Sequence, residues 1–140
     1  MKVAIVAARF NAFIVEPLVD RAKETLRERG VVDGDIFVAE VPGAFEIPAV
    51  ARRLADSGAW DAIICVGCVI RGATSHYDFV AGHAAYGIGE VAMKSKVPVI
   101  FGVLTVENVE QAVERVGHGA DFARAALDMA SLYRELEARA

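Results

Sequence analysis

Continuous apolar runs of strand length alternate along the chain with segments in which apolar residues recur at helical spacing. The runs are typical of strands that are buried on both faces of a parallel sheet, because such strands have no side that faces water. We expect four of these strands, at residues 2–7, 35–41, 60–66 and 99–104.

The remaining segments predict five helices. Their ends carry helix-ending or capping residues, such as Gly30 after the first helix and the turn 105–108 before the fourth. We expect the helices at about residues 13–30, 48–58, 78–94 and 109–116, and from Asp121 onward. The predicted apolar face of the first helix consists of Phe13, Leu18, Ala22 and Leu26. That of the last consists of Phe122, Ala125, Ala126, Met129, Leu132, Tyr133 and Leu136.

The alternation of strands and helices predicts an α/β fold, because parallel strands are joined by right-handed helical crossovers. We expect a three-layer α/β/α sandwich of the flavodoxin-like type, with a four-stranded parallel sheet in the order 2-1-3-4. In that order the segments that follow the first three strands should meet in one crevice at the switch point. Residues 1–140 are predicted to form a single domain.

Composition narrows the class of protein. Apolar residues make up 55% of the chain and charged residues 24%, a balance that predicts surface buried between subunits and hence an oligomer. The net charge of −4 argues against a nucleic-acid partner, which would need a basic face. No apolar stretch approaches the roughly 18–20 residues that span a bilayer, so we expect no membrane partner and a cytoplasmic location.

Two cysteines stand three residues apart around the end of the third apolar run. On a strand, the side chains of Cys65 and Cys68 would point to opposite faces of the sheet, about 10 Å apart, which is too far for a disulfide. We therefore expect two buried, reduced thiols. Nothing in their surroundings indicates a metal site.

The richest chemistry lies in residues 67–78, a loop between a strand and a helix that contains glycines, hydroxyls and titratable groups. Its glycine spacing imitates a P-loop, but Ala73 stands where that motif needs lysine, which argues against nucleotide hydrolysis. The loop can still hold one phosphate through backbone N–H groups and Thr74 at a helix N-terminus. His76 is close enough to transfer a proton, and a surface or cap role is the alternative.

Two other segments reach the same predicted crevice. Phe10 follows the first strand and can stack on a planar ring, or else pack under the first helix. Glu46 follows the second strand and can accept hydrogen bonds from a polyol, or else act as a carboxylate favoured by the helix dipole. Composition and spacing thus indicate a site for a phosphate and a planar ring, but they specify no reaction.

Three further basic or titratable groups have competing interpretations. Arg71 is expected to pair with Asp78 or Glu90 rather than with a substrate. Arg115 stands near the end of the short fourth helix, where the helix dipole alone favours a cation. For His83 we expect a solvated or structural role.

Several of these stretches together resemble the 6,7-dimethyl-8-ribityllumazine synthase family, which belongs to riboflavin biosynthesis. The resemblance covers nearly the whole chain, and the combination is far more specific than any single motif. The matching stretches follow the family's order and spacing at residues 8–11, 41–48, 67–78, 98–105 and 110–115.

The resemblance implies a reaction and a set of site residues. The family condenses 5-amino-6-ribitylaminouracil with 3,4-dihydroxy-2-butanone 4-phosphate, releases phosphate and water, and needs no cofactor. The implied catalytic residues are His76, for proton transfer, and Arg115, which binds phosphate from a neighbouring subunit. The implied substrate-binding residues are Phe10, Asn11, Ala44, Phe45, Glu46, Cys68, Val69, Ile70, Ala73 and Thr74, with Phe101 from the same neighbour.

The resemblance also implies which of these residues contact each substrate. Phe10 would stack on the pyrimidine ring, with Val69 and Ile70 at the ring's edge. Asn11 and the turn 44–46 would hold the ribityl chain, and the 73–74 pair would bind the phosphate.

The resemblance also implies a homopentamer with sites shared between adjacent subunits, and some relatives assemble twelve pentamers into a shell. Here the family's Lys-Gly pair after the arginine has no counterpart, and we expect no N-terminal extension of the kind that many relatives carry. These departures leave the shell open and favour a free pentamer. Riboflavin synthase, which consumes the lumazine product, is the protein partner that the resemblance suggests.

Three alternatives belong to other classes. A non-catalytic flavin-binding module would share the fold and the phosphate loop, but it would not need His76 and Arg115 together. An archaeal-type riboflavin synthase would share the fold, but the intact loop from Gly72 to His76 argues against it. A purely structural shell protein would assemble without affinity for either substrate.

Overall fold

The computed structural model describes all 140 residues and contains one parallel sheet. Its strands are β1 (Val3–Ala8), β2 (Ile36–Val41), β3 (Ala62–Ile70) and β4 (Val99–Val106). They lie in the order β2-β1-β3-β4, and every neighbouring pair is parallel. The predicted α/β fold and strand order are therefore confirmed.

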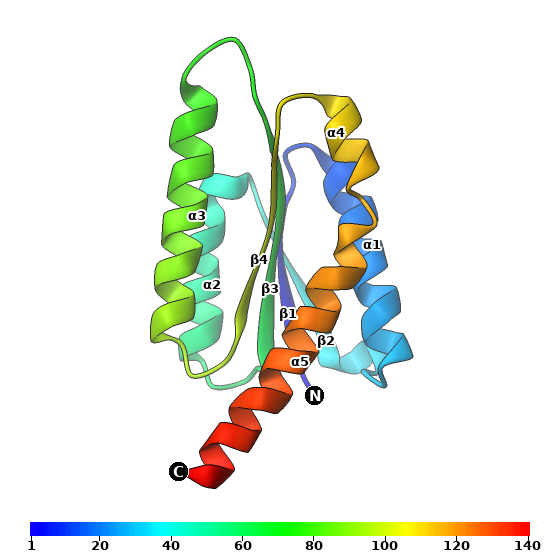
Figure 1. Ribbon diagram of the computed structural model, residues 1–140, viewed down its shortest axis with the longest axis vertical. Coiled ribbons are helices and arrows are strands. Elements are labelled where there is room, and N and C mark those ends of the chain that lie inside the picture. Colours follow the sequence, from blue (N-terminus) through cyan, green and yellow to red (C-terminus); the bar gives the residue numbers. More distant parts are fainter.

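Five helices cover the two faces of this sheet, as Figure 1 shows. On one face lie α1 (Ala12–Glu28), α4 (Val109–Glu114) and α5 (His118–Arg139), and on the other lie α2 (Ile47–Asp56) and α3 (His76–Lys94). Two short 3₁₀ turns, η1 (Asp33–Asp35) and η2 (Ala44–Glu46), flank β2. The result is the expected three-layer sandwich.

Burial on both faces explains why the apolar runs are continuous. All six residues of β1 are buried, and so are the first eight of β3. Alternate side chains of these strands belong to two separate cores: Ile5 and Ile64 pack with α1 and α5, whereas Val6 and Cys65 pack with α2 and α3. Each central strand must therefore be apolar at every position.

Two boundaries differ clearly from the predictions. The third strand continues through residues 67–70 instead of ending at residue 66. Gly67 belongs to the strand, and its lack of a side chain leaves room for Ile47 of α2. The last helix begins at His118 instead of Asp121, and Asp121 makes no capping hydrogen bond. Gly119 lies inside this helix, where there is no room for a Cβ, because α5 passes close to the Leu18 carbonyl of α1.

The predicted apolar faces of α1 and α5 are partly wrong. On α1, Phe13 is 57% exposed, whereas its neighbour Ile14 is buried. On α5 the buried face consists of Gly119, Ala123, Ala126, Leu127 and Ala130. The small residues on this face let the helix lie close to α1. Leu132 and Leu136, which were predicted to be on the apolar face, are exposed. Its last turns extend beyond the sheet (Figure 1).

A line of large apolar side chains remains in water on α3. Phe79, Tyr86 and Met93 recur every seven residues, and their exposed fractions are 72%, 74% and 89%. A seven-residue repeat places them on one side of the helix. No helix in the structure is long and apolar enough to cross a membrane.

Candidate active site

A cleft of about 640 Å³ opens where β1, β2 and β3 end and α3 begins. It lies at the switch point between β1 and β3, where parallel α/β sheets bind ligands. Most of the site residues expected from the sequence line it: Phe10, Asn11, Ala44, Phe45, Glu46, Cys68, Val69, Ile70, Thr74 and His76. Ala73 stands in the loop between two lining residues, Gly72 and Thr74, without lining the cleft itself.

Asn11 joins two sides of the cleft floor. Its backbone has φ 61°, a left-handed conformation that asparagine tolerates better than most residues. Its side-chain amide donates a 2.7 Å hydrogen bond to the Cys68 carbonyl, so the ends of β1 and β3 are tied together. The Oδ1 atom is then oriented by this bond and can accept a hydrogen bond from a ligand.

The adjoining residue Phe10 stands at the cleft with 72% of its surface exposed. Its backbone N–H donates a 3.0 Å hydrogen bond to the Pro42 carbonyl, which extends the contact between β1 and β2 beyond the ladder. The alternative in which Phe10 packs under the first helix is wrong in the single chain. The ring is available for stacking.

The turn η2 forms a second wall. Glu46 occupies the N-cap position of α2 but makes no capping hydrogen bond, so its carboxylate can accept bonds from a ligand. The first N–H groups of such a turn have no acceptor within it and can also donate to a ligand. Phe45 stacks on His83 of α3, with ring centroids 3.9 Å apart and planes 19° apart. The sequence analysis missed this role of His83, and its only signal was a position two turns after His76 on the same helix.

The loop between β3 and α3 arches above the sheet (Figure 1) and ends at His76, the first residue of α3. The backbone N–H of His76 donates to Thr74 Oγ1 at 3.3 Å, and the side chains of both residues reach the cleft. The side chain of the N-cap residue Ser75 makes no capping hydrogen bond. The free N–H groups and dipole of α3 therefore favour an anion beside the loop.

Arg71 makes ion pairs and an aromatic contact that fix this loop. Its Nε lies 3.0 Å from a Glu107 carboxylate oxygen and its NH1 lies 3.6 Å from Asp78. The guanidinium also lies 4.4 Å from the ring centroid of Tyr77, which lines the cleft. The expected pairing with Asp78 is present, whereas Glu90 pairs with Lys94 instead.

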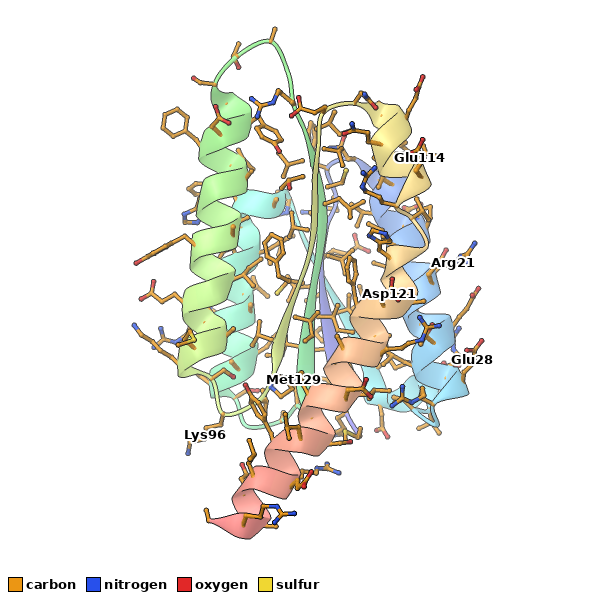
Figure 2. All side chains as sticks on the ribbon, viewed as in Figure 1. Arg21, Glu28, Lys96, Glu114, Asp121 and Met129 are labelled. Carbon is orange, nitrogen blue, oxygen red and sulfur yellow. The ribbon has the colours of Figure 1, made fainter.

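Arg115 and Phe101 lie outside the cleft of their own chain. Arg115 follows α4, and its NH1 donates a 2.8 Å hydrogen bond to the Gln111 carbonyl. The adjacent Glu114 is on the side of the sheet opposite α3 (Figure 2). Phe101 is on the edge strand β4 and is 42% exposed. One chain alone does not bring either residue to the cleft.

The start of α4 is fixed by reciprocal capping. Asn108 Oδ1 accepts a 2.9 Å hydrogen bond from the Gln111 N–H, and Gln111 Oε1 accepts one of 2.8 Å from the Glu107 N–H. This arrangement resembles a capping box. The cap lies in the predicted turn 105–108, but amide oxygens provide it instead of the expected hydroxyl and carboxylates. It links the residue that pairs with Arg71 to the helix that carries Arg115.

The two cysteines lie on opposite faces of β3, and neither forms a disulfide. Burial raises the pKa of Cys65 to about 12 and that of Cys68 to about 11. No group of three or more histidine, cysteine or acidic side chains in the chain is arranged to hold a metal ion.

These thiols should resist a thiol reagent at pH 8 in the folded chain, because only the thiolate reacts. The expected result is negligible labelling before unfolding and reaction of both cysteines in denaturant. Above the ordinary thiol pKa of about 8.5, the unfolded chain loses protons that the folded chain keeps, so stability should fall as the pH rises toward 12. Rapid labelling of the native chain would contradict this burial.

The fold and the cleft define a doubly wound α/β protein with a cleft at the switch point of its sheet. Residues 1–134 match the family model described as 6,7-dimethyl-8-ribityllumazine synthase, and the chain therefore belongs to that family. Members of the family are transferases of riboflavin biosynthesis. The chain is accordingly an enzyme of this pathway that acts on small-molecule substrates.

Proposed function

We propose that the chain condenses 5-amino-6-ribitylaminouracil with 3,4-dihydroxy-2-butanone 4-phosphate to give 6,7-dimethyl-8-ribityllumazine, phosphate and water, without a cofactor. The observation that carries the proposal is the convergence of three segments on one cleft: an exposed aromatic ring, a turn rich in polar groups and an anion-favouring loop. These features suit the pyrimidine, the ribityl chain and the phosphate, respectively.

The uracil substrate fits the half of the cleft between β1 and η2. Phe10 offers a face for stacking on the pyrimidine, and Val69 and Ile70 offer apolar contacts at its edge. The Glu46 carboxylate and the N–H groups of the turn are suited to the ribityl hydroxyls. Because both walls are joined by hydrogen bonds in the free chain, little reorganisation is needed on binding.

The reaction begins when the 5-amino group attacks the ketone and water leaves to form an imine. Loss of the proton from the carbon beside the imine then allows the phosphate to leave from the next carbon. The enol that results tautomerises to a new ketone that carries a methyl group, and attack of the ribitylamino nitrogen on this ketone closes the ring with loss of water. His76 lies beside the loop proposed to hold the phosphate, where an imidazole can take up and return these protons. Holding the two substrates in register contributes much of the acceleration.

The cleft of a single chain is incomplete for this reaction, since no lysine or arginine lines it. A phosphate dianion in a cleft calls for a cation. Arg115 and Phe101 are partly exposed and lie away from their own cleft. We propose that a second copy supplies both, in a pentamer in which the apolar line of α3 is buried, because an exposed stripe of this size is typical of a subunit interface.

His76→Ala should lower kcat about tenfold, less than the roughly 100-fold or more that a general acid–base residue often contributes. The loss is limited because alignment of the substrates does not depend on the imidazole. The measurement is steady-state turnover from pH 5 to pH 9. A variant with an unchanged rate at every pH would contradict the role in proton transfer.

The direct test of the proposed function is an assay with both substrates, in which the lumazine product is followed by absorbance and fluorescence. We expect turnover without added metal or nucleotide. A control enzyme of known activity should consume the same substrates. Failure of this chain under conditions in which the control succeeds would contradict the enzyme proposal and favour a binding module or a shell protein.

A further inference from the structure

His83 lies on α3 and contacts the η2 wall of the cleft through Phe45. Its imidazole stacks on Phe45 with ring centroids 3.9 Å apart and planes 19° apart. His83 itself does not line the cleft, whereas Phe45 does. Within one chain the histidine therefore contacts a residue of the cleft wall without lining the cleft itself.

The η2 turn is short, and the ring at its centre is half exposed. It contains only three residues, and the hydrogen bond from the Glu46 N–H to the Gly43 carbonyl is long at 3.2 Å. Ala44 and Ile47 are buried at its two ends, but Phe45 between them is 50% exposed. A half-exposed ring retains rotamer freedom unless a neighbour restricts it, and His83 is the aromatic group that stacks on it.

We propose that His83 is a positioning residue that holds the turn 44–46 in the conformation that binds the ribityl chain. This inference rests on the proposed function and adds to it a residue that touches neither substrate. An aromatic pair contributes about 0.5–1.5 kcal/mol beyond its buried area, which corresponds to roughly a twofold to tenfold change in an equilibrium constant. His83 therefore adjusts affinity for one substrate and leaves the chemical step alone.

The effect should be confined to the uracil substrate. The phosphate loop meets α3 at His76, and seven helical residues separate this position from His83, which is about 10 Å along the axis. The loop is held by its own contacts, including the pairing of Arg71 with Glu107. Loss of the stack at Phe45 should not alter these contacts of the loop.

The test compares His83→Ala, His83→Phe and Glu90→Ala with the wild-type chain. Glu90 lies two turns farther along the same side of α3, on the face that also carries Phe79, Tyr86 and Met93, and it pairs with Lys94. Its variant therefore controls for a change in that helix face and in the assembly proposed to bury it. Each substrate is varied in turn while the other is saturating. Thermal unfolding and the oligomeric state are measured for every variant.

We expect His83→Ala to raise the KM for ribitylaminouracil about fivefold, in line with the loss of one aromatic pair. The kcat and the KM for the butanone phosphate should change less than about twofold, within the scatter expected for surface changes. His83→Phe should restore the wild-type KM, because a phenyl ring can also stack on Phe45. Glu90→Ala should behave as the wild type.

An unchanged uracil KM in His83→Ala would overturn the inference. So would an equal rise in both KM values, or a failure of His83→Phe to restore binding, because each would indicate a general effect on the fold. These results differ from a failure of the proposed function. Absence of turnover in the wild-type chain would contradict that function and remove the basis of the inference with it.

Discussion

Arg115→Ala is expected to raise the KM for the butanone phosphate about 100-fold, because removing one partner of a desolvated charge pair costs about 2–5 kcal/mol. The cleft contains no other arginine or lysine side chain. The KM for ribitylaminouracil should change little, since the aromatic and polyol contacts come from the chain's own cleft. Steady-state kinetics with each substrate varied in turn provide the measurement.

Mixed oligomers test whether the arginine comes from a neighbour. Chains with Arg115→Ala are unfolded and refolded together with chains that carry Phe10→Ala. Each variant alone should be nearly inactive, but sites that combine a normal cleft with a neighbour's normal arginine should recover activity. Arg115→Lys serves as a charge-retaining control that binds without the bidentate geometry of arginine. Recovery no greater than the sum of the separate variants would show that Arg115 does not act across subunits.

Gly119→Ala is expected to lower the free energy of unfolding by about 3 kcal/mol, at the upper end of the usual cost of overpacking. A Cβ at this position would overlap the Leu18 carbonyl oxygen and stand 2.9 Å from the Arg21 Cβ. Two helix backbones would have to separate, because the first of these contacts is with main chain rather than with a flexible side chain. Urea unfolding of the purified chain gives the measurement.

Gly117→Ala is the matched control, two residues earlier in the same segment. No atom lies within 4 Å of a Cβ at Gly117, and its φ of −61° is one that alanine adopts readily. Its stability should be unchanged or slightly higher, since alanine restricts the unfolded chain. Equal stability of the two variants would mean that α1 and α5 do not approach as closely as the structure indicates.

The apolar pattern predicts the sheet well because strands that are buried on both faces appear in the sequence as continuous apolar runs. The pattern fails at glycine, which can either end a strand or helix or allow another element to pack closely against it. Gly67 suggested a loop, but it belongs to β3, where a side chain would press on Ile47 of α2. Gly119 suggested a break, but it is the helical position that α1 approaches. In both cases the deciding contact comes from a distant part of the chain.

The same distinction applies to the site. Phe10, Glu46 and the 73–76 segment could be predicted because each directly follows a strand, and the carboxyl ends of parallel strands share one edge. The stacking of His83 could not, because it depends on how α3 lies over η2. The contribution proposed for Arg115 depends on another copy of the chain, so neither the sequence pattern nor a single chain displays it.

The strand order also has a consequence for biosynthesis. The first strand to leave the ribosome, β1, ends up in the interior of the sheet between β2 and β3. One of its faces is closed partly by α5, which follows all four strands in the sequence and packs in the same core as α1. A chain that is still being made therefore exposes this apolar surface until α5 has emerged. Transient shielding of such surface is a task of chaperones, and shortening α5 should increase the need for it.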